Sequence, residues 1–224
     1  MPARIYQETI SIGPDLTLRC TLAVPEPVDG PLPLVLALHY GWVGERPSPF
    51  YGGGVLTGLV GPALASLGAL IVAPDCPSKD WTASESEAAL AALWDHLHVT
   101  YPLDDQRTLV TGYSLGGMGA WHLASRWPER FRAAVVMAGW PAPGAVERLA
   151  IPLYVIHSRA DEVIPLAPTE AAVAALRARE HPLEFVTLEG ITHYEVGRFD
   201  RPLRAAARWV EGLWGAVAGR GVLW

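Results

Sequence analysis

Short unbroken runs of apolar residues alternate along this chain with longer segments in which apolar residues recur every three to four positions. An unbroken run is typical of a strand buried on both faces of a parallel sheet, and the longer spacing indicates a helix with one buried face. The runs that we expect to be buried strands are residues 34–39, 69–74, 108–111, 133–138, 153–158 and 183–188. Strands that alternate with helices in this way predict a parallel sheet covered on both faces.

The first residues of the chain follow a different pattern. Residues 5–11 and 16–24 both have strand character and lie close enough in sequence to form an antiparallel hairpin. With the buried runs, this hairpin predicts an α/β fold, a mostly parallel, doubly wound sheet of about eight strands. No segment resembles an interdomain linker, so we expect one domain over residues 1–224.

Amphipathic spacing predicts the helices of this fold. They are expected at about residues 55–67, 115–126, 168–179 and 202–217, and in a further segment that begins at Ser84. Ser84 and Glu87 have the spacing of a capping box, in which each side chain binds the backbone N–H of the other residue. The capping box therefore supports a helix that begins at Ser84.

Composition and charge exclude several classes of protein. Half of the residues are hydrophobic, 18% are charged and the net charge is −6, which is typical of a globular protein and argues against a nucleic-acid partner. The N-terminal residues lack the apolar core of a signal peptide, and no apolar run reaches the length of a membrane span. Cys20 and Cys76 lack metal-ligand spacing. We therefore expect a cytoplasmic protein with no membrane partner, no metal and no cofactor.

The segment Gly112-Tyr113-Ser114-Leu115-Gly116 fits Gly-x-Ser-x-Gly, a pattern that places serine on a sharp turn between a strand and a helix. The backbone at such a turn is strained, and the residues two positions away must be small to avoid collision. The context fits as well, because an apolar strand precedes the motif and a helical segment follows it. Ser114 is thus the candidate nucleophile.

A serine hydroxyl needs a base within hydrogen-bond reach and a third group that orients the base. In open α/β sheets such groups lie in loops beyond the carboxyl ends of strands. Asp161 follows the strand at 153–158, and His193 follows the strand at 183–188. Both positions suit a catalytic site with Ser114.

Other residues compete for these places. Glu162 is the nearest alternative to Asp161, Asp75 also follows a strand, and Asp200 is a weaker alternative. Among the other histidines His39 ends a strand, and we expect it to order the loop that follows.

The order Ser114, Asp161, His193 resembles the α/β-hydrolase superfamily, whose triads run Ser, Asp, His. Residues 111–121, together with Pro128-Glu129-Arg130-Phe131, are similar to the small lidless branch of phospholipase/carboxylesterase-like and dienelactone-hydrolase-like proteins. The resemblance spans nearly the whole chain and implies an α/β-hydrolase fold without a lid domain. Dienelactone hydrolases proper carry cysteine at the elbow, so the serine favours the esterase side of the branch.

The resemblance also implies a role for each residue. Ser114 would attack the substrate carbonyl, His193 would take and return the proton, and Asp161 would orient the imidazole. Two backbone N–H groups, of Leu115 and Tyr40, would form the oxyanion hole. The chain reads His39-Tyr40-Gly41-Trp42 where many lipases have His-Gly-Gly-Gly, which leaves the second donor open.

Loop aromatics are the candidates for substrate binding. Four of them fall in loops expected at the rim of the site, with core packing as the alternative for each: Trp42, Tyr51, Trp81 and Trp140. Only residues 141–151 separate two strands where larger relatives insert a lid, so we expect an accessible site.

The expected function is that of a serine carboxylic-ester hydrolase that acts on small-molecule esters with short or medium acyl groups through an acyl-serine intermediate. Thioesterases, lactone hydrolases and peptidases use the same machinery and remain alternatives. A non-catalytic hydrolase-fold binding protein is a further alternative from another class. A homodimer is compatible with the sequence, which does not fix the oligomeric state.

Overall fold

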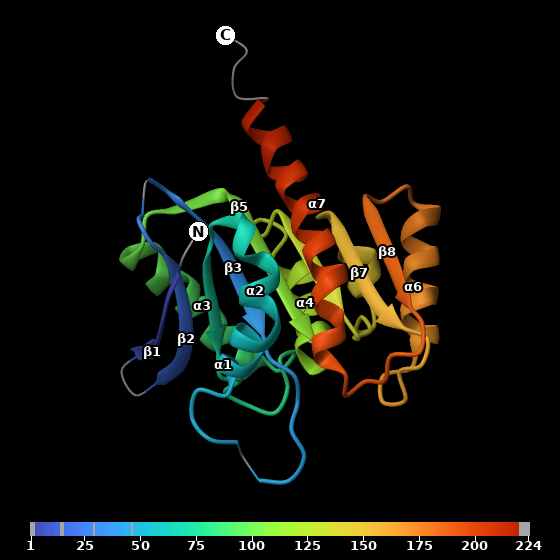
Figure 1. Ribbon diagram of the computed structural model, residues 1–224, viewed down its shortest axis with the longest axis horizontal. Coiled ribbons are helices and arrows are strands. Elements are labelled where there is room, and N and C mark those ends of the chain that lie inside the picture. The colour runs from blue at the N-terminus through green and yellow to red at the C-terminus, as the bar shows by residue number, and fades with distance from the viewer. Residues whose placement is uncertain (1–2, 14–15, 29, 46, 220–224) are drawn as a thin grey trace.

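The computed structural model describes residues 3–13, 16–28, 30–45 and 47–219, and a single eight-stranded sheet runs through its centre (Figure 1). The strands are β1 (Ala3–Ser11), β2 (Thr17–Pro25), β3 (Leu32–Leu38), β4 (Leu70–Pro74), β5 (Leu103–Tyr113), β6 (Ala133–Met137), β7 (Leu153–Ser158) and β8 (Leu183–Leu188). Their order in the sheet is β1-β2-β4-β3-β5-β6-β7-β8.

Strand directions agree with the predicted fold class. β1 pairs with β2 and β2 pairs with β4 in antiparallel fashion, whereas the pairs from β4 through β3 and β5 to β8 are parallel. The mostly parallel sheet with an N-terminal antiparallel hairpin is therefore confirmed. β5 begins five residues before the predicted run at 108, because the polar residues 104–107 extend it toward solvent, where no unbroken apolar pattern is needed.

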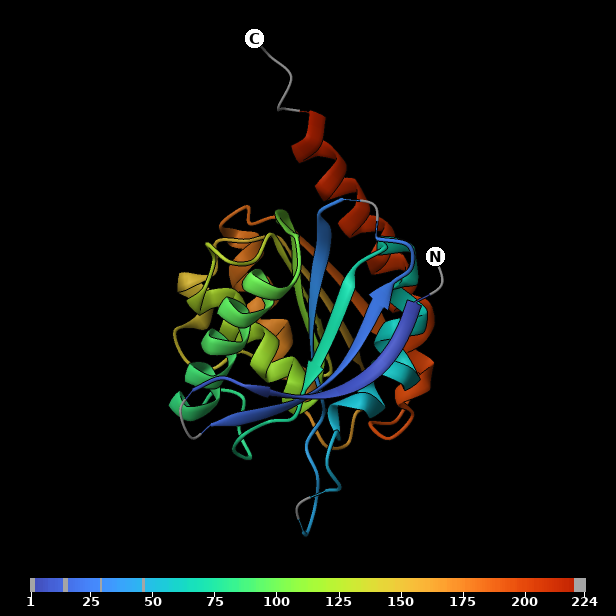
Figure 2. The same cartoon turned by 90° about the vertical axis from the view of Figure 1, so that its left-hand side faces the viewer.

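Helices cover both faces of the sheet. The helical segments are α1 (Gly52–Val55), η1 (Leu56–Val60), α2 (Gly61–Leu64), η2 (Ala65–Leu67), α3 (Ser84–Thr100), α4 (Leu115–Arg126), α5 (Ala145–Arg148), α6 (Leu166–Ala178), η3 (Val196–Phe199) and α7 (Asp200–Gly219). Viewed along the sheet, α3, α4 and α6 lie on one side, and the α1–α2 segment and α7 lie on the other (Figure 2). Each layer contributes its apolar stripe to a separate core, which is the arrangement of a doubly wound sheet.

The helical run after the long loop begins earlier than predicted and is irregular. It starts at Gly52 instead of residue 55, and η1 is a π-helical turn in which the N–H of Gly61 donates to the carbonyl of Leu56. Pro62 has no N–H to donate, so the regular hydrogen-bond ladder is broken at this point. The amphipathic pattern locates the run but does not reveal this turn.

The predicted capping box is wrong. Ala83 is the N-cap residue of α3, no side chain caps this end, and Ser84 is already helical. The Glu87 carboxylate instead contacts His122 at 3.1 Å and Arg126 at 3.4 Å, both on α4. Contact with a neighbouring helix has replaced the local cap.

The helices α6 and α7 each begin two residues before the prolines at which they were predicted to start, Pro168 and Pro202. The first four N–H groups of a helix have no acceptor within the helix, so a proline is tolerated inside the first turn.

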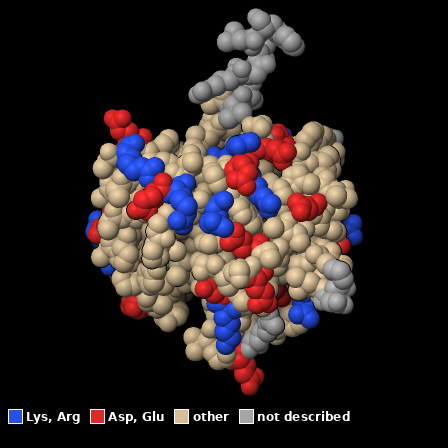
Figure 3. Space-filling view, turned by 180° about the vertical axis from the view of Figure 1, so that it is seen from behind, with Lys and Arg blue, Asp and Glu red and all other residues tan. Residues whose placement is uncertain are grey.

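The connection between β6 and β7 contains only the four-residue helix α5, which agrees with the expected fold without a lid domain. Within the described ranges, no helix is long and apolar enough to cross a membrane. On the face seen from behind, acidic and basic side chains lie interspersed (Figure 3).

Candidate active site

Ser114 lies at the sharp turn between β5 and α4. Its backbone has φ 56° and ψ −118°, a conformation that costs energy for a residue with a side chain. A Cβ on Gly112 would lie 2.2 Å from the carbonyl oxygen of Gly116, and a Cβ on Gly116 would lie 2.0 Å from that of Leu38. Both glycines of the motif are therefore required by the close approach of backbone to backbone.

The structure brings Ser114, His193 and Asp161 together. Nε2 of His193 lies 2.9 Å from Oγ of Ser114, and its Nδ1 lies 2.8 Å from Oδ2 of Asp161. The serine and the histidine are largely buried, and the Asp161 side chain is 1% exposed. The geometry is that of a nucleophile, a base and an orienting acid, and the catalytic role of each residue stays a prediction.

Backbone groups fix the orientation of the Asp161 carboxylate. Its Oδ1 accepts the N–H of Val163 at 3.0 Å and the N–H of Ile164 at 2.7 Å. The second oxygen, Oδ2, is left facing His193 and requires a proton on Nδ1 of the imidazole. Nε2 is consequently free of a proton in the neutral ring and can accept the hydroxyl proton of Ser114.

The alternative acids have other partners. Glu162 accepts the backbone N–H of His193 at 2.9 Å and so holds the main chain of the histidine rather than its ring. Asp75 accepts the N–H groups of Phe50 and Gly52 at 2.8 and 2.9 Å. Asp200 binds Arg204 at 2.9 Å.

Tyr113, the residue before Ser114, contacts both the backbone and the ring of His193. Its hydroxyl donates to the carbonyl oxygen of His193 at 2.7 Å, and the two rings lie 5.4 Å apart. Burial raises the pKa of the Tyr113 phenol, so the hydroxyl keeps its proton and remains a donor. This contact ties the loop of His193 to the nucleophile strand.

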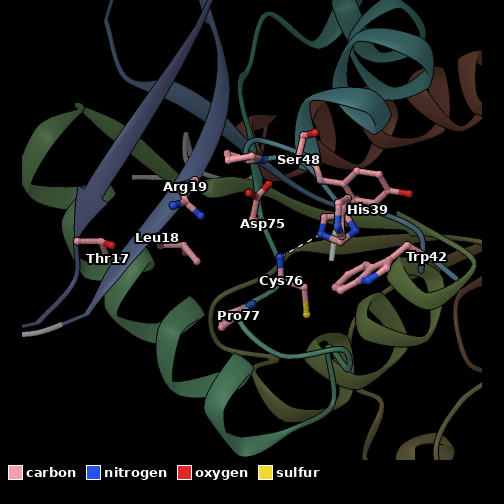
Figure 4. Close-up of a pocket in the computed structure, with 12 residues that line it drawn as sticks. Thr17, Leu18, Arg19, His39, Trp42, Ser48, Asp75, Cys76 and Pro77 are labelled. Atoms are coloured by element: carbon pink, nitrogen blue, oxygen red, sulfur yellow. Dashed lines mark hydrogen bonds between the residues drawn. The ribbon is translucent and has the colours of Figure 1, made fainter. Parts of the chain in front are cut away.

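His39 orders the loop after β3, as the sequence predicts. Its Nδ1 donates to the carbonyl oxygen of Tyr40 at 2.7 Å, and its Nε2 accepts the N–H of Cys76 at 3.0 Å (Figure 4). Burial lowers the pKa of His39, which keeps the ring neutral, as the accepting nitrogen requires. The tautomer is thus matched to both partners.

Tyr40 and Leu115 are the predicted oxyanion donors. Tyr40 lies in the wall of a cleft that also contains Ser114. The next residue, Gly41, lies close enough to α4 that a Cβ on it would be 3.6 Å from Cβ of Leu115. The loop and the first turn of α4 therefore meet beside Ser114, which is where two converging N–H groups would be needed. Their role as oxyanion donors stays a prediction.

The cleft above Ser114 has a volume of about 580 Å³. Its wall is mostly apolar and aromatic, formed by Tyr40, Gly41, Trp42, Val43, Tyr51, Tyr113, Ser114, Val163, His193, Tyr194 and Val196. Trp42 and Tyr51 thus lie where the sequence predicts substrate contact.

Two predicted substrate contacts do not line the cleft. Trp81 is 0% exposed and donates its indole N–H to the carbonyl oxygen of His39, so the prediction for Trp81 is corrected. Its ring packs beneath the loop against α4, where a Cβ on Gly119 would lie 2.5 Å from Cβ of Trp81. Trp140 is half-buried and stands outside the cleft wall.

Sequence reasoning missed several residues of the cleft. Tyr194 is 76% exposed, and its ring lies 5.9 Å from that of His193. Val163 and Val43 are also exposed apolar residues of the cleft wall. Tyr194 directly follows the candidate base and Val163 lies two residues after the candidate acid, so their neighbours in sequence were the available signal.

A second, smaller pocket of about 80 Å³ lies behind the same loop, between His39, Trp42 and Asp75 (Figure 4). Trp42 and Tyr51 belong to the walls of both cavities and separate them. No group of three or more His, Cys, Asp or Glu side chains in the described ranges is arranged to hold a metal ion.

Comparison with solved structures identifies the fold. A thermostable esterase shares 24% identity at a TM-score of 0.79, over 93% of this chain and 62% of the esterase, so this chain spans less than two thirds of that protein. A ferulic acid esterase shares 15% identity at a TM-score of 0.75, over 95% of this chain and 100% of the other. The S-formylglutathione hydrolase of Staphylococcus aureus shares 14% identity at a TM-score of 0.73, over 94% and 99%. At these identities the likeness establishes the fold, which is that of the α/β-hydrolase superfamily.

Comparison of sequences identifies the family. No protein of curated function matches this chain. The sequence profile of the PET hydrolase-like family matches residues 56–202, a range that includes Ser114, Asp161 and His193. The resemblance to the α/β-hydrolase superfamily is confirmed, and within it the chain belongs to the PET hydrolase-like family.

Proposed function

We propose that the protein is a serine carboxylic-ester hydrolase that works through an acyl-serine intermediate. The observation that carries the proposal is the hydrogen-bonded series from Ser114 through His193 to Asp161, with distances of 2.9 and 2.8 Å. It opens into a cleft that is wide enough for a small organic ester. A serine in this setting has the base and the oriented tautomer that nucleophilic attack requires.

The reaction would proceed in two halves. Oγ of Ser114 attacks the ester carbonyl while Nε2 of His193 takes its proton and passes it to the leaving alcohol. Asp161 stabilises the imidazolium that forms, and the N–H groups of Tyr40 and Leu115 stabilise the negative oxygen of the tetrahedral intermediate. Water then gives a proton to Nε2 of His193 as it attacks the acyl carbon, and His193 returns that proton to Oγ of Ser114 as the bond to the serine breaks and the acid leaves.

The cleft wall supports an apolar acyl or alcohol group. The aromatic rings of Tyr40, Trp42, Tyr51 and Tyr194 surround the entrance to Ser114, and aromatic rings favour flat or apolar partners. The names of the family and of one structural neighbour, a ferulic acid esterase, point to esters as well. We infer that short or medium esters are accepted, and that an aromatic acyl group gains affinity from this wall.

Thioester hydrolysis is the second candidate. One structural neighbour is named as an S-formylglutathione hydrolase, and the same triad chemistry cleaves a thioester. Lactone opening and peptide cleavage need no different residues. Substrate comparison on one enzyme preparation separates these activities.

The test is hydrolysis of p-nitrophenyl esters of increasing acyl length by the wild-type protein and by Ser114→Ala. Ser125→Ala is the matched control, because Ser125 is a buried serine of α4 whose hydroxyl donates to the carbonyl of His122 at 2.9 Å. We expect Ser114→Ala to lose at least about 10³-fold in kcat. Ser125→Ala should stay close to the wild type.

Equal turnover by the wild type and the folded Ser114→Ala variant would reject the acyl-serine mechanism. No turnover on any ester, thioester, lactone or peptide by the folded wild type would favour a binding protein that keeps the hydrolase fold.

A further inference from the structure

A second histidine lies behind the candidate acid. His157, at the end of β7, has no exposed surface. Its Nε2 lies 2.9 Å from the carbonyl oxygen of Ile164 and 3.6 Å from Oδ2 of Asp161, the oxygen that His193 contacts. Its Nδ1 lies 3.1 Å from Oγ1 of Thr169. Both nitrogens of a buried ring thus have specific partners next to the triad.

These partners assign the protons of the ring. A carbonyl oxygen can only accept, so Nε2 of His157 carries a proton and donates it to Ile164. In the neutral ring Nδ1 is then an acceptor. The hydroxyl of Thr169 beside it has one proton, which it can donate either to Nδ1 at 3.1 Å or to the carbonyl oxygen of Gly139 at 3.2 Å. Burial lowers the pKa of His157, consistent with a neutral ring, and the ionisable groups that act on it are Asp161, His193 and Glu170.

The bond to Ile164 acts on the candidate acid through one residue. The carbonyl of Ile164 accepts from His157, and the N–H of Ile164 donates to Oδ1 of Asp161 at 2.7 Å. The ring therefore holds Ile164, at the end of the turn at residues 161–164, in place. The N–H of Ile164 is one of the two donors that orient the Asp161 carboxylate. The same Nε2 lies 3.6 Å from Oδ2, so the positive end of its N–H dipole attracts the oxygen that faces His193.

The other side of the ring is tied to the nucleophile helix. Oγ1 of the buried Thr169 lies 3.2 Å from the carbonyl oxygen of Gly139, which also accepts the indole N–H of Trp121 at 3.1 Å. Trp121 belongs to α4, the helix that begins directly after Ser114. Through the side chain of Thr169, His157 thus lies next to the Gly139 carbonyl, which binds the helix that follows the nucleophile.

His157 does not reach the substrate. It is absent from the wall of the cleft, and Asp161 separates it from His193. His157 can therefore affect the reaction only through Asp161. It has no direct contact with a substrate in the cleft.

We propose that His157 is a positioning residue for the reaction, which holds the carboxylate of Asp161 against His193 through Ile164 and through its own Nε2–H, while Thr169 lies against its Nδ1 and holds the ring in place. The inference rests on the proposed function, because it needs the triad to be the catalytic group.

The experiment compares two pairs of variants with the wild type in ester hydrolysis. His157→Leu removes both hydrogen bonds, and His157→Gln keeps a terminal N–H that can reach Ile164. Thr169→Val removes the hydroxyl at nearly constant shape, and Thr169→Ser keeps it. We expect His157→Leu to lower kcat about 10- to 100-fold with little change in KM, because a small misplacement of a catalytic group has a cost of that size. His157→Gln should recover most of the kcat that His157→Leu loses, and Thr169→Ser should recover most of the kcat that Thr169→Val loses.

The pH profile distinguishes positioning from simple destabilisation. Loss of a well-placed Asp161 makes the imidazolium of His193 less stable, so the acidic limb of the kcat/KM profile should move to lower pH in His157→Leu and Thr169→Val. A merely destabilised protein would lose active molecules and keep the position of the limb. Circular dichroism melts show which variants are folded, and Thr169→Val serves if His157→Leu does not fold.

Two results would overturn the inference. The first is a kcat within about twofold of the wild type in folded His157→Leu or Thr169→Val, because the expected loss is about 10-fold or more. The second is a lower kcat with an unmoved acidic limb and no recovery in His157→Gln or Thr169→Ser. Ser114→Ala in the same assay separates the two proposals, since undiminished turnover by that variant would reject the triad itself.

Discussion

Replacement of Asp161 by asparagine exchanges one oxygen of the site for an NH₂ group, so a hydrogen-bond acceptor becomes a donor. The oxygen Oδ1 accepts two backbone N–H groups, of Val163 at 3.0 Å and Ile164 at 2.7 Å, so the amide oxygen of Asp161→Asn must stay there. The amide NH₂ then takes the place of Oδ2, which lies 2.8 Å from Nδ1 of His193. Two donors face each other, and the ring moves its proton to Nε2 to avoid the clash. Nε2 can then no longer accept from Ser114.

The expected loss in kcat is about 10⁴-fold, which is the size seen where the same change forces the wrong tautomer in a serine protease. It corresponds to roughly 5.4 kcal/mol of transition-state stabilisation at about 1.36 kcal/mol per factor of ten. The fold should persist, because asparagine has the shape of aspartate and still accepts from both backbone groups.

The assay is steady-state hydrolysis of p-nitrophenyl butyrate, with a thermal melt of each protein. Asp75→Asn and Glu162→Gln are the matched controls, since each carboxylate accepts backbone N–H groups near the site and neither contacts the His193 ring. The amide oxygen of Glu162→Gln can keep its one bond to the N–H of His193. Asp75→Asn keeps one of its two bonds, because the N–H groups of Phe50 and Gly52 bind different oxygens, but it leaves the contacts of the His193 ring untouched. We therefore expect both controls to stay within about tenfold of the wild type in kcat, a loss of no more than roughly 1.4 kcal/mol.

Folded Asp161→Asn with kcat within about tenfold of the wild type would refute the reasoning, since that is far from the loss that a wrong tautomer causes. A larger loss in Asp75→Asn than in Asp161→Asn would transfer the role of the acid to Asp75.

Three further predictions concern the elbow, the pH dependence and the cleft. Gly116→Ala places a Cβ 2.0 Å from the Leu38 carbonyl oxygen, so we expect a loss of about 3 kcal/mol and a fall in Tm of roughly 6–12 °C. Burial lowers the pKa of His39, so the folded ring stays neutral while the unfolded chain binds a proton below about pH 6.5. The free energy of unfolding therefore falls as the pH drops below that value, and urea titrations should show a smaller fall in His39→Gln. Trp42→Ala should raise KM for benzoyl esters about tenfold, or roughly 1.4 kcal/mol, and affect acetyl esters less.

Each of these predictions has a contradicting result. Gly212→Ala is the control for Gly116→Ala, because its Cβ would meet no atom within 4 Å. Equal melting temperatures of the two variants would mean that α4 does not approach β3 as closely as described. Equal acid sensitivity of the wild type and His39→Gln would mean that the ring is not held neutral. Equal effects of Trp42→Ala on both esters would place that indole outside the acyl site.

The sequence predicts those elements whose structure depends on residues close together in the chain. The ends of α4, β7 and β8 agree with the sequence, because apolar runs bounded by turn residues leave little freedom there. The Gly-x-Ser-x-Gly turn was predictable for the same reason, since only glycine fits the contacts around Ser114. The superfamily followed from this motif together with the order of Asp161 and His193.

Contacts between distant residues were beyond local reasoning. Three successive glycines hide the start of the helical run at Gly52, and the N–H of Gly52 is held by Asp75, 23 residues away. Trp81 looked like a rim residue because its loop follows a strand, but its indole turns inward to the carbonyl of His39. His157 lies within a predicted buried strand, and its place behind Asp161 emerges only when β7 and its loop are seen together.

The most direct test of the central claim is a stopped-flow measurement of p-nitrophenol release under pre-steady-state conditions, with intact-mass analysis of the quenched protein. If Ser114 forms an acyl-enzyme, p-nitrophenol appears in a burst approaching one equivalent per enzyme. The protein then gains the mass of one acyl group, and the peptide that contains Ser114 carries it. Turnover that persists in Ser114→Ala, with no acyl group found on the wild-type protein, would contradict the account.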